Sequence, residues 1–147
     1  MKLSKTSGLI ALLILASLFL SSCRGIKYDT ITVMHAQNTN TLADALAAKS
    51  TTDYTANAAQ IQQLKDSLQA AINYEKGKGK TNFATTNMWV SINAYINTSF
   101  LAKWNTDHKF TDAAFATELK SRLDKLFGYI TNLEENKVGG PLQQKTN

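Results

Sequence analysis

The sequence predicts an all-α fold, a small antiparallel helical bundle of three long helices and one short helix. Three observations lead to this prediction. Apolar residues return every three or four positions over three long stretches, which is the period of one face of an α-helix. Residues that favour helix starts precede these stretches. The connections between them are brief, so consecutive helices are expected to lie side by side and antiparallel.

The first 22 residues have the composition of an export signal. Lys2 and Lys5 precede the uncharged run LIALLILASLFL, residues 9–20. A basic start followed by an apolar run of this length is typical of a signal peptide. The run is also shorter than the about 20 apolar residues that span a bilayer. We therefore expect residues 1–22 to be removed by cleavage.

The end of the apolar run carries the only cysteine of the chain. Leu20-Ser21-Ser22-Cys23 resembles the lipobox of bacterial lipoprotein precursors at all four positions. The resemblance covers residues 1–23 and implies cleavage between Ser22 and Cys23, a diacylglyceryl group on the Cys23 sulfur and a third acyl chain on the new amino terminus. The other interpretation is an ordinary signal peptide before a buried or spare thiol, but a lone exported cysteine has no disulfide partner.

Residues 23–38 are expected to be the lipidated cysteine and an extended tether. Residues 28–33 are rich in β-branched side chains in an alternating pattern, which is typical of extended chain or a short edge strand. The bundle domain is then expected over residues 39–138. Its short helix is predicted to start at a capping box, Thr41-Leu42-Ala43-Asp44, and to end at Lys49.

The first long helix is predicted to follow a second cap signature, Ser50-Thr51-Thr52-Asp53, and to run to about Lys76. Its apolar stripe comprises Ile61, Leu64, Leu68, Ala71 and Ile72. Two glycines and four charges in residues 75–80 then predict a mobile basic loop. The loop lysines Lys76, Lys78 and Lys80 are candidates for contact with an anion or with phospholipid headgroups, and a solvated connector is the simpler interpretation.

The second long helix is predicted from about Thr86 to Asn105 and carries a large share of the aromatic residues. Its buried stripe comprises Trp89, Ile92, Ile96, Phe100 and Trp104. Stacked at helical spacing, these side chains are expected to form the centre of the core.

The third long helix has the clearest start. Thr111 is the predicted N-cap, and Phe110 and Phe115 are placed to form a hydrophobic staple around it. Glu118 and Arg122 are spaced for an i,i+4 ion pair. The stripe of this helix comprises Phe115, Leu119, Leu123, Leu126, Ile130 and Leu133. Gly139-Gly140-Pro141 is expected to stop the helix, and residues 139–147 are predicted to be a flexible C-terminal tail.

The net charge and the cysteine content of the mature chain argue against some classes of protein, in particular nucleic-acid binders and disulfide-stabilised folds. Cleavage at Cys23 leaves 14 basic and 11 acidic residues, a net charge of +3, in a chain long enough for one modest core. Nucleic-acid binders concentrate more basic charge than this, so nucleic acid is not an expected partner. No cysteine remains for a disulfide, and stability must come from packing.

The sequence contains no recognisable constellation for catalysis, a metal or a cofactor. Gly79-Lys80-Thr81 has the end of a phosphate-binding loop, but Tyr74 stands where that motif needs a glycine. His35 and His108 have no zinc-ligand spacing. Glu134 and Glu135 are interpreted as a solvated helix end. We therefore expect no enzyme activity, no metal and no cofactor.

The sequence leads to one function hypothesis and one alternative. The first is a membrane-anchored bacterial envelope lipoprotein that acts as a non-enzymatic interaction or structural module. It contacts the membrane through its lipid anchor and has a protein partner in the envelope. Arg24, in place of Asp, after the cysteine resembles outer-membrane sorting in enteric bacteria. This resemblance implies the outer membrane in a Gram-negative host, and the cell membrane is expected in other bacteria. The alternative is a small-ligand binder or carrier whose pocket is lined by Trp89, Phe100 or Trp104.

Overall fold

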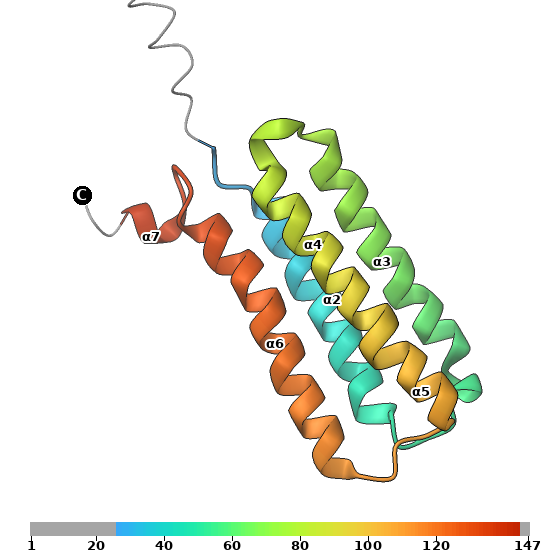
Figure 1. Cartoon of the computed structure of the whole chain (residues 1–147). Helices are drawn as coiled ribbons and strands as arrows, with labels where there is room; N and C mark the ends of the chain where they lie inside the picture. The colour runs from blue at the N-terminus through green and yellow to red at the C-terminus, as the bar shows by residue number, and fades with distance from the viewer. Residues whose placement is uncertain (1–25, 145–147) are drawn as a thin grey trace, which may run out of the picture.

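The computed structural model describes residues 26–144, and in it four long helical rods pack side by side as an antiparallel bundle (Figure 1). Ser22 and Cys23 lie outside the described residues. In chain order the rods are α2 (Thr30–Lys49), α3 (Ala58–Gly77), the joined helices α4 (Phe83–Tyr95) and α5 (Ala102–Asp107), and α6 (Ala113–Glu135). Residues 26–144 form no named strand, and the predicted all-α helical bundle is confirmed.

Helix α2 is longer than the sequence predicts, because the expected tether is helical from Thr30 onward. Asp29 caps the helix by accepting a hydrogen bond from the Ile31 amide at 2.8 Å. The extended assignment for residues 30–38 is therefore wrong. Two of the buried positions are threonines, so a search for periodic apolar residues does not detect the buried face of this helix. Packing against other helices also outweighs the preference of the β-branched side chains for extended structure. The buried residues of α2 are Thr32, Val33, Ala36, Thr39, Ala43, Leu46 and Ala47.

The predicted capping box at Thr41 is also wrong. Thr41 lies in the middle of α2, where its hydroxyl donates a hydrogen bond to the Gln37 carbonyl oxygen at 3.0 Å. The short helix expected over residues 41–49 is thus the second half of a full-length helix. The bundle has four long rods instead of three long helices and one short one.

Helix α3 has the predicted stripe and starts later than predicted. A single 3-10 turn, η1 (Thr55–Asn57), precedes it, and Asp53 accepts a hydrogen bond from the Thr55 amide at 2.8 Å. All five predicted stripe residues of α3, from Ile61 to Ile72, are buried. The stripe spacing was sufficient to place the helix, whereas its first turn depended on cap geometry.

The third rod is continuous from Phe83 to Asp107 and contains a π-helical segment, η3 (Ile96–Leu101), between α4 and α5. A π turn is wider than an α turn and changes the register of the face that follows it. Here Ile96, Phe100 and Leu101 are all buried. The wide turn therefore lets two adjacent side chains, at positions 100 and 101, face the core.

Helix α6 begins at Ala113, one residue later than predicted. Asp112 is the N-cap and accepts a hydrogen bond from the Ala114 amide at 2.7 Å. The expected staple contact is present, with ring centroids of Phe110 and Phe115 4.5 Å apart. The expected ion pair between Arg122 and Glu118 is also present, at 2.5 Å.

The two ends of the described chain lie beside each other at one end of the bundle. The Tyr28 amide donates a hydrogen bond to the Val138 carbonyl oxygen at 3.0 Å, and the Val138 amide donates to the Ile26 carbonyl oxygen at 3.2 Å. These bonds form an isolated parallel bridge between Lys27 and Val138. The segment before α2 is thereby held against the segment after α6.

The predicted flexible tail, residues 139–147, is ordered in its first part. Pro141–Gln144 forms the one-turn helix α7. Gly140 permits the turn before it, because a Cβ at this position would come within 2.3 Å of the Glu135 carbonyl oxygen. Gly139 adopts a positive φ of 83°, which glycine reaches without strain. Helix α6 ends at Glu135 with Asn136 as its C-cap, before the glycines, so the prediction that they stop the helix is wrong. The glycines instead turn the chain into α7.

The core is built around Trp89, Phe100 and Trp104, each with no exposed surface. The rings of Phe100 and Trp104 are stacked with centroids 5.7 Å apart. The two tryptophans differ in one respect. The Trp104 indole N–H donates to the Thr52 carbonyl oxygen at 3.0 Å, whereas the buried Trp89 indole N–H has no hydrogen-bond partner among the described residues.

This difference predicts unequal effects of the same substitution. Trp104→Phe and Trp89→Phe both remove volume from the core, but only Trp104→Phe also breaks a hydrogen bond. We expect Trp104→Phe to lower the free energy of unfolding by about 1 to 2 kcal/mol more than Trp89→Phe does. Urea unfolding of both variants, followed by circular dichroism, measures this difference. Equal losses, or a larger loss for Trp89→Phe, would contradict it.

Candidate functional site

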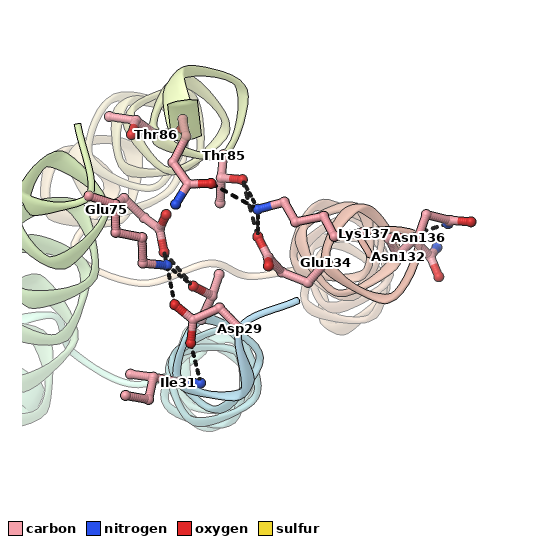
Figure 2. A network of polar contacts seen from close by, with 12 residues as sticks. Asp29, Ile31, Glu75, Thr85, Thr86, Asn132, Glu134, Asn136 and Lys137 are labelled. Atoms are coloured by element: carbon pink, nitrogen blue, oxygen red, sulfur yellow. Dashed lines mark hydrogen bonds and ion pairs between the residues drawn. The ribbon is translucent and has the colours of Figure 1, made fainter. Parts of the chain in front are cut away.

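A network of buried polar side chains lies at the end of the bundle where α2 and α4 begin and where α3 and α6 end (Figures 1 and 2). We call this network the polar cluster. It is the largest departure from an apolar interior, because its two glutamates have no exposed surface. Its members are Asp29, Thr32, Tyr74, Glu75, Lys78, Asn82, Thr85, Glu134 and Lys137.

The first half of the polar cluster joins α2 to the end of α3. Glu75 Oε1 accepts hydrogen bonds from the Thr32 hydroxyl at 2.5 Å and from Lys78 Nζ at 2.7 Å. Lys78 Nζ also forms an ion pair with Asp29 Oδ2 at 2.6 Å. The Tyr74 hydroxyl donates to the same Asp29 oxygen at 2.9 Å. One lysine therefore neutralises a carboxylate from each of two helix ends.

The second half joins α4 to the end of α6. Lys137 Nζ forms an ion pair with Glu134 Oε1 and donates to Asn82 Oδ1 at 3.1 Å. The Thr85 hydroxyl donates to Glu134 Oε1 at 3.2 Å. The Lys137 side chain is only 8% exposed, so this ion pair is almost fully removed from water.

The two halves have the same construction. In each, a glutamate in the last turn of a helix is followed three residues later by a lysine, and a threonine near the start of the preceding rod donates to the same carboxylate oxygen. A carboxylate is unfavourable at a helix C-terminus, and the adjacent ammonium group compensates for it. The second oxygen of each carboxylate, Oε2 of Glu75 and of Glu134, is buried without a hydrogen-bond partner among the described residues. Figure 2 shows these two side chains directed inward from opposite sides.

The charges of the first half stabilise one another. Partial burial raises the pKa of Asp29, but the hydrogen bonds from Lys78, Tyr74 and the Ile31 amide outweigh burial and hold the pKa at about 2. Burial lowers the pKa of Lys78, but its bonds to Asp29 and Glu75 raise it overall above the ordinary value. Burial and the neighbouring Asp29 raise the pKa of the Tyr74 hydroxyl. All three groups therefore keep their usual protonation states at neutral pH.

The three lysines that the sequence predicts to contact an anion or headgroup have different environments in the structure. Lys78 is not part of a mobile loop, since it is fixed in the polar cluster by two carboxylates. Lys76 and Lys80 lie next to it, are exposed, and form no ion pair with any described residue. Of the three lysines predicted to contact an anion or headgroup, only Lys76 and Lys80 have ammonium groups free of an ion pair with a described residue. Glu134, interpreted from the sequence as solvated, is instead completely buried.

The cluster contains ionised groups that are already paired inside the protein. Among residues 26–144 no three side chains of the metal-ligating types lie close enough to hold an ion. His35 packs against the Tyr74 ring with centroids 5.4 Å apart, and His108 lies in the connection before α6 with a φ of 59°. The histidines are therefore in different environments at opposite ends of the bundle.

The aromatic interior has no opening at the residues proposed for a ligand pocket. Trp89, Phe100 and Trp104 are completely buried and pack against other rings. A hollow of about 450 Å³ exists at the far end of the bundle, where Phe110 and Phe115 line it together with charged side chains. This hollow is open to solvent and does not reach Trp89.

Over residues 26–144, no helix has both the length and the apolar character needed to cross a bilayer. No protein-family model, curated protein or solved structure matches this chain.

The buried ion pair of Glu134 predicts a large effect of removing one charge. Glu134→Gln leaves the ammonium group of Lys137 buried without a counter-ion, so we expect a loss of about 3 kcal/mol in the free energy of unfolding. The matched control is Glu118→Gln, which breaks an ion pair whose side chains are both 60% exposed. Its expected loss is below about 0.5 kcal/mol. Urea unfolding at pH 7 compares them, and equal losses would show that burial does not strengthen the Glu134 pair.

The low pKa of Asp29 predicts a pH-dependent contribution to stability. The folded-state pKa of about 2 lies below the unfolded value, which is about 3.9. The contribution is therefore complete above about pH 5 and is lost as the pH falls toward 2. Asp29→Asn keeps a good N-cap residue and removes the charge. We expect this variant to be about 1 kcal/mol less stable than the wild type at pH 7, with most of that difference gone at pH 2. A difference that stays constant in urea unfolding between these pH values would contradict the assignment.

Proposed function

We propose that the protein is a membrane-anchored lipoprotein of the bacterial envelope. The observation that carries the proposal is Leu20-Ser21-Ser22-Cys23 at the end of an apolar run, with the only cysteine of 147 residues in the lipidated position. Acyl chains on Cys23 would bind a membrane through about 0.8 kcal/mol per buried methylene, and more than one chain gives stable anchoring. The chain would then be held at the envelope by its first mature residue.

We further propose that the bundle acts as a non-enzymatic interaction or structural module. The use of its buried charges supports this role. Lys78 and Lys137 neutralise Glu75 and Glu134 within the protein, in positions that tie helix ends together. Groups engaged in this way stabilise the arrangement of the helices and are not poised to transfer protons to a substrate.

The ligand-binding alternative stays a prediction. It requires a cavity at Trp89, Phe100 or Trp104, and these three side chains are completely buried against their neighbours. The hollow at the far end is lined by Phe110 and Phe115. The protein-contact role is therefore the one that we develop.

Lipidation can be tested directly in the native host or a bacterial expression host. Wild-type protein is expected to incorporate an alkyne fatty acid and to sediment with membranes. Cys23→Ala removes the acceptor sulfur, so this variant is expected to lose the label and to leave the membrane fraction. Ser21→Ala is the matched control, because it keeps a small residue in the same motif and should remain labelled. Wild-type protein that is unlabelled and soluble would overturn the proposal.

A further inference from the structure

Exposed apolar side chains gather at the end of the bundle that carries the polar cluster. Large hydrophobic residues at least 38% exposed occur at eight described positions, and six of these lie at this end. Phe83 is the most exposed of them at 67%, followed by Val138 at 61%. The connections at the opposite end, residues 50–57 and 108–112, contribute none of the eight. The six residues are Ile26, Ile31, Met34, Phe83, Val138 and Leu142.

These six residues come from separate segments that meet at one end of the molecule (Figure 1). Ile26 precedes α2, Phe83 opens α4, and Val138 follows α6. The open hollow at this end includes Ile26 and none of the other five. Apolar groups distributed over one end fit a flat and fluid surface better than a shaped one.

The same end carries unpaired positive charge. Lys27, Lys76 and Lys80 are exposed and form no ion pair with any residue in the described range 26–144. Farther along the bundle, Lys103 and Lys120 are paired with aspartates, whereas Lys49, Lys109 and Lys125 are also exposed and form no ion pair with any described residue. The end with the polar cluster differs from these sites in that its free lysines lie beside exposed apolar side chains. Free ammonium groups beside exposed apolar side chains are the composition of a surface that lies on anionic headgroups.

An open hollow of about 380 Å³ lies among these groups. It is lined by apolar and donor side chains, including Ile26, Lys27, Thr81 and Asn82, and also by the Asp29 carboxylate, which Lys78 neutralises. A headgroup phosphate would find ammonium, hydroxyl and amide donors there, with an apolar side chain next to them.

The position of Cys23 determines which surface meets the membrane. Only two residues separate Cys23 from Ile26, and three residue steps of chain span at most about 10 Å. If Cys23 is lipidated, as proposed above, the end that carries Ile26 is held within this distance of the acyl chains. The far end of the bundle cannot reach the membrane unless the whole molecule tips over.

We propose that this end of the bundle is a membrane-docking surface, which lies on the bilayer with its apolar side chains among the lipid headgroups and its free lysines on their phosphates. Phe83, Val138 and Leu142 enter the boundary between headgroups and acyl chains. Lys27, Lys76 and Lys80 contact anionic headgroups around them. The bundle therefore stands on the membrane and does not swing freely on a long tether. This inference rests on the lipidation of Cys23.

The test uses the lipidated mature protein in vesicles of phosphatidylethanolamine and phosphatidylglycerol. The acylated sulfur of Cys23 does not react with a thiol probe, so Phe83→Cys or Val138→Cys provides a single site for an environment-sensitive fluorophore. Thr111→Cys, exposed at the far end, is the matched control. Nitroxide-labelled lipids are expected to quench the probe at positions 83 and 138 about threefold more than at position 111, since interfacial side chains lie about 5 to 10 Å deep.

The outcomes separate the docking surface from the anchor. If the protein floats with the vesicles but the probes at positions 83, 138 and 111 are quenched equally, the proposed docking surface is wrong. The lipoprotein proposal is not affected by that result. An unmodified Cys23, detected by intact mass, would overturn both. Replacing Lys27, Lys76 and Lys80 with Gln is expected to lower the quenching at position 83 about twofold. Replacing Lys49, Lys109 and Lys125 with Gln should not lower the quenching at position 83. Equal effects of the two triple variants would show that Lys27, Lys76 and Lys80 are not part of the membrane-docking surface.

Discussion

The structure depends on the burial of two carboxylates at one end of a helical bundle. Glu75 and Glu134 have no exposed surface, and contacts with a lysine and a threonine compensate for the burial of each carboxylate. The lysine comes from the same helix end and the threonine from a different rod. Sliding α2 against α3, or α4 against α6, would separate these groups and leave a buried charge without a partner. An apolar interface tolerates such a shift much better, so the polar cluster fixes the register of the helices.

The sequence was sufficient for the fold class because the stripes of α3, α4 and α6 are long and strongly periodic. It was insufficient for α2. Five of the seven buried residues of that helix are alanine or threonine, including Thr32 and Thr39, and its first turns are rich in β-branched residues. Their helical state depends on contacts with other helices, among them the bond from Thr32 to Glu75. A local pattern cannot contain that information.

The candidate site was predicted in part. The glycines and charges of residues 75–80 indicate Lys76, Lys78 and Lys80 as candidates. The local sequence does not predict that Lys78 forms an ion pair with Asp29, 49 positions earlier. Glu134 was missed because a glutamate at a helix end is usually solvated. One local signal was present: both buried glutamates have a lysine three residues later, at the end of a helix, with a glycine of positive φ soon after it. That spacing becomes informative only when the two occurrences are compared.

The pairing of Ile26 and Tyr28 with Val138 has a consequence for the dimensions of the anchored molecule. Both ends of the described chain leave the bundle at the same end, so the connections of residues 50–57 and 108–112 form the opposite pole. Helices of 20 to 23 residues separate the two poles, a rise of about 30 to 35 Å at 1.5 Å per residue. A protein held through Cys23 would thus be a rigid spacer of fixed height. Whatever binds at its distal pole would be kept at that distance from the lipid surface.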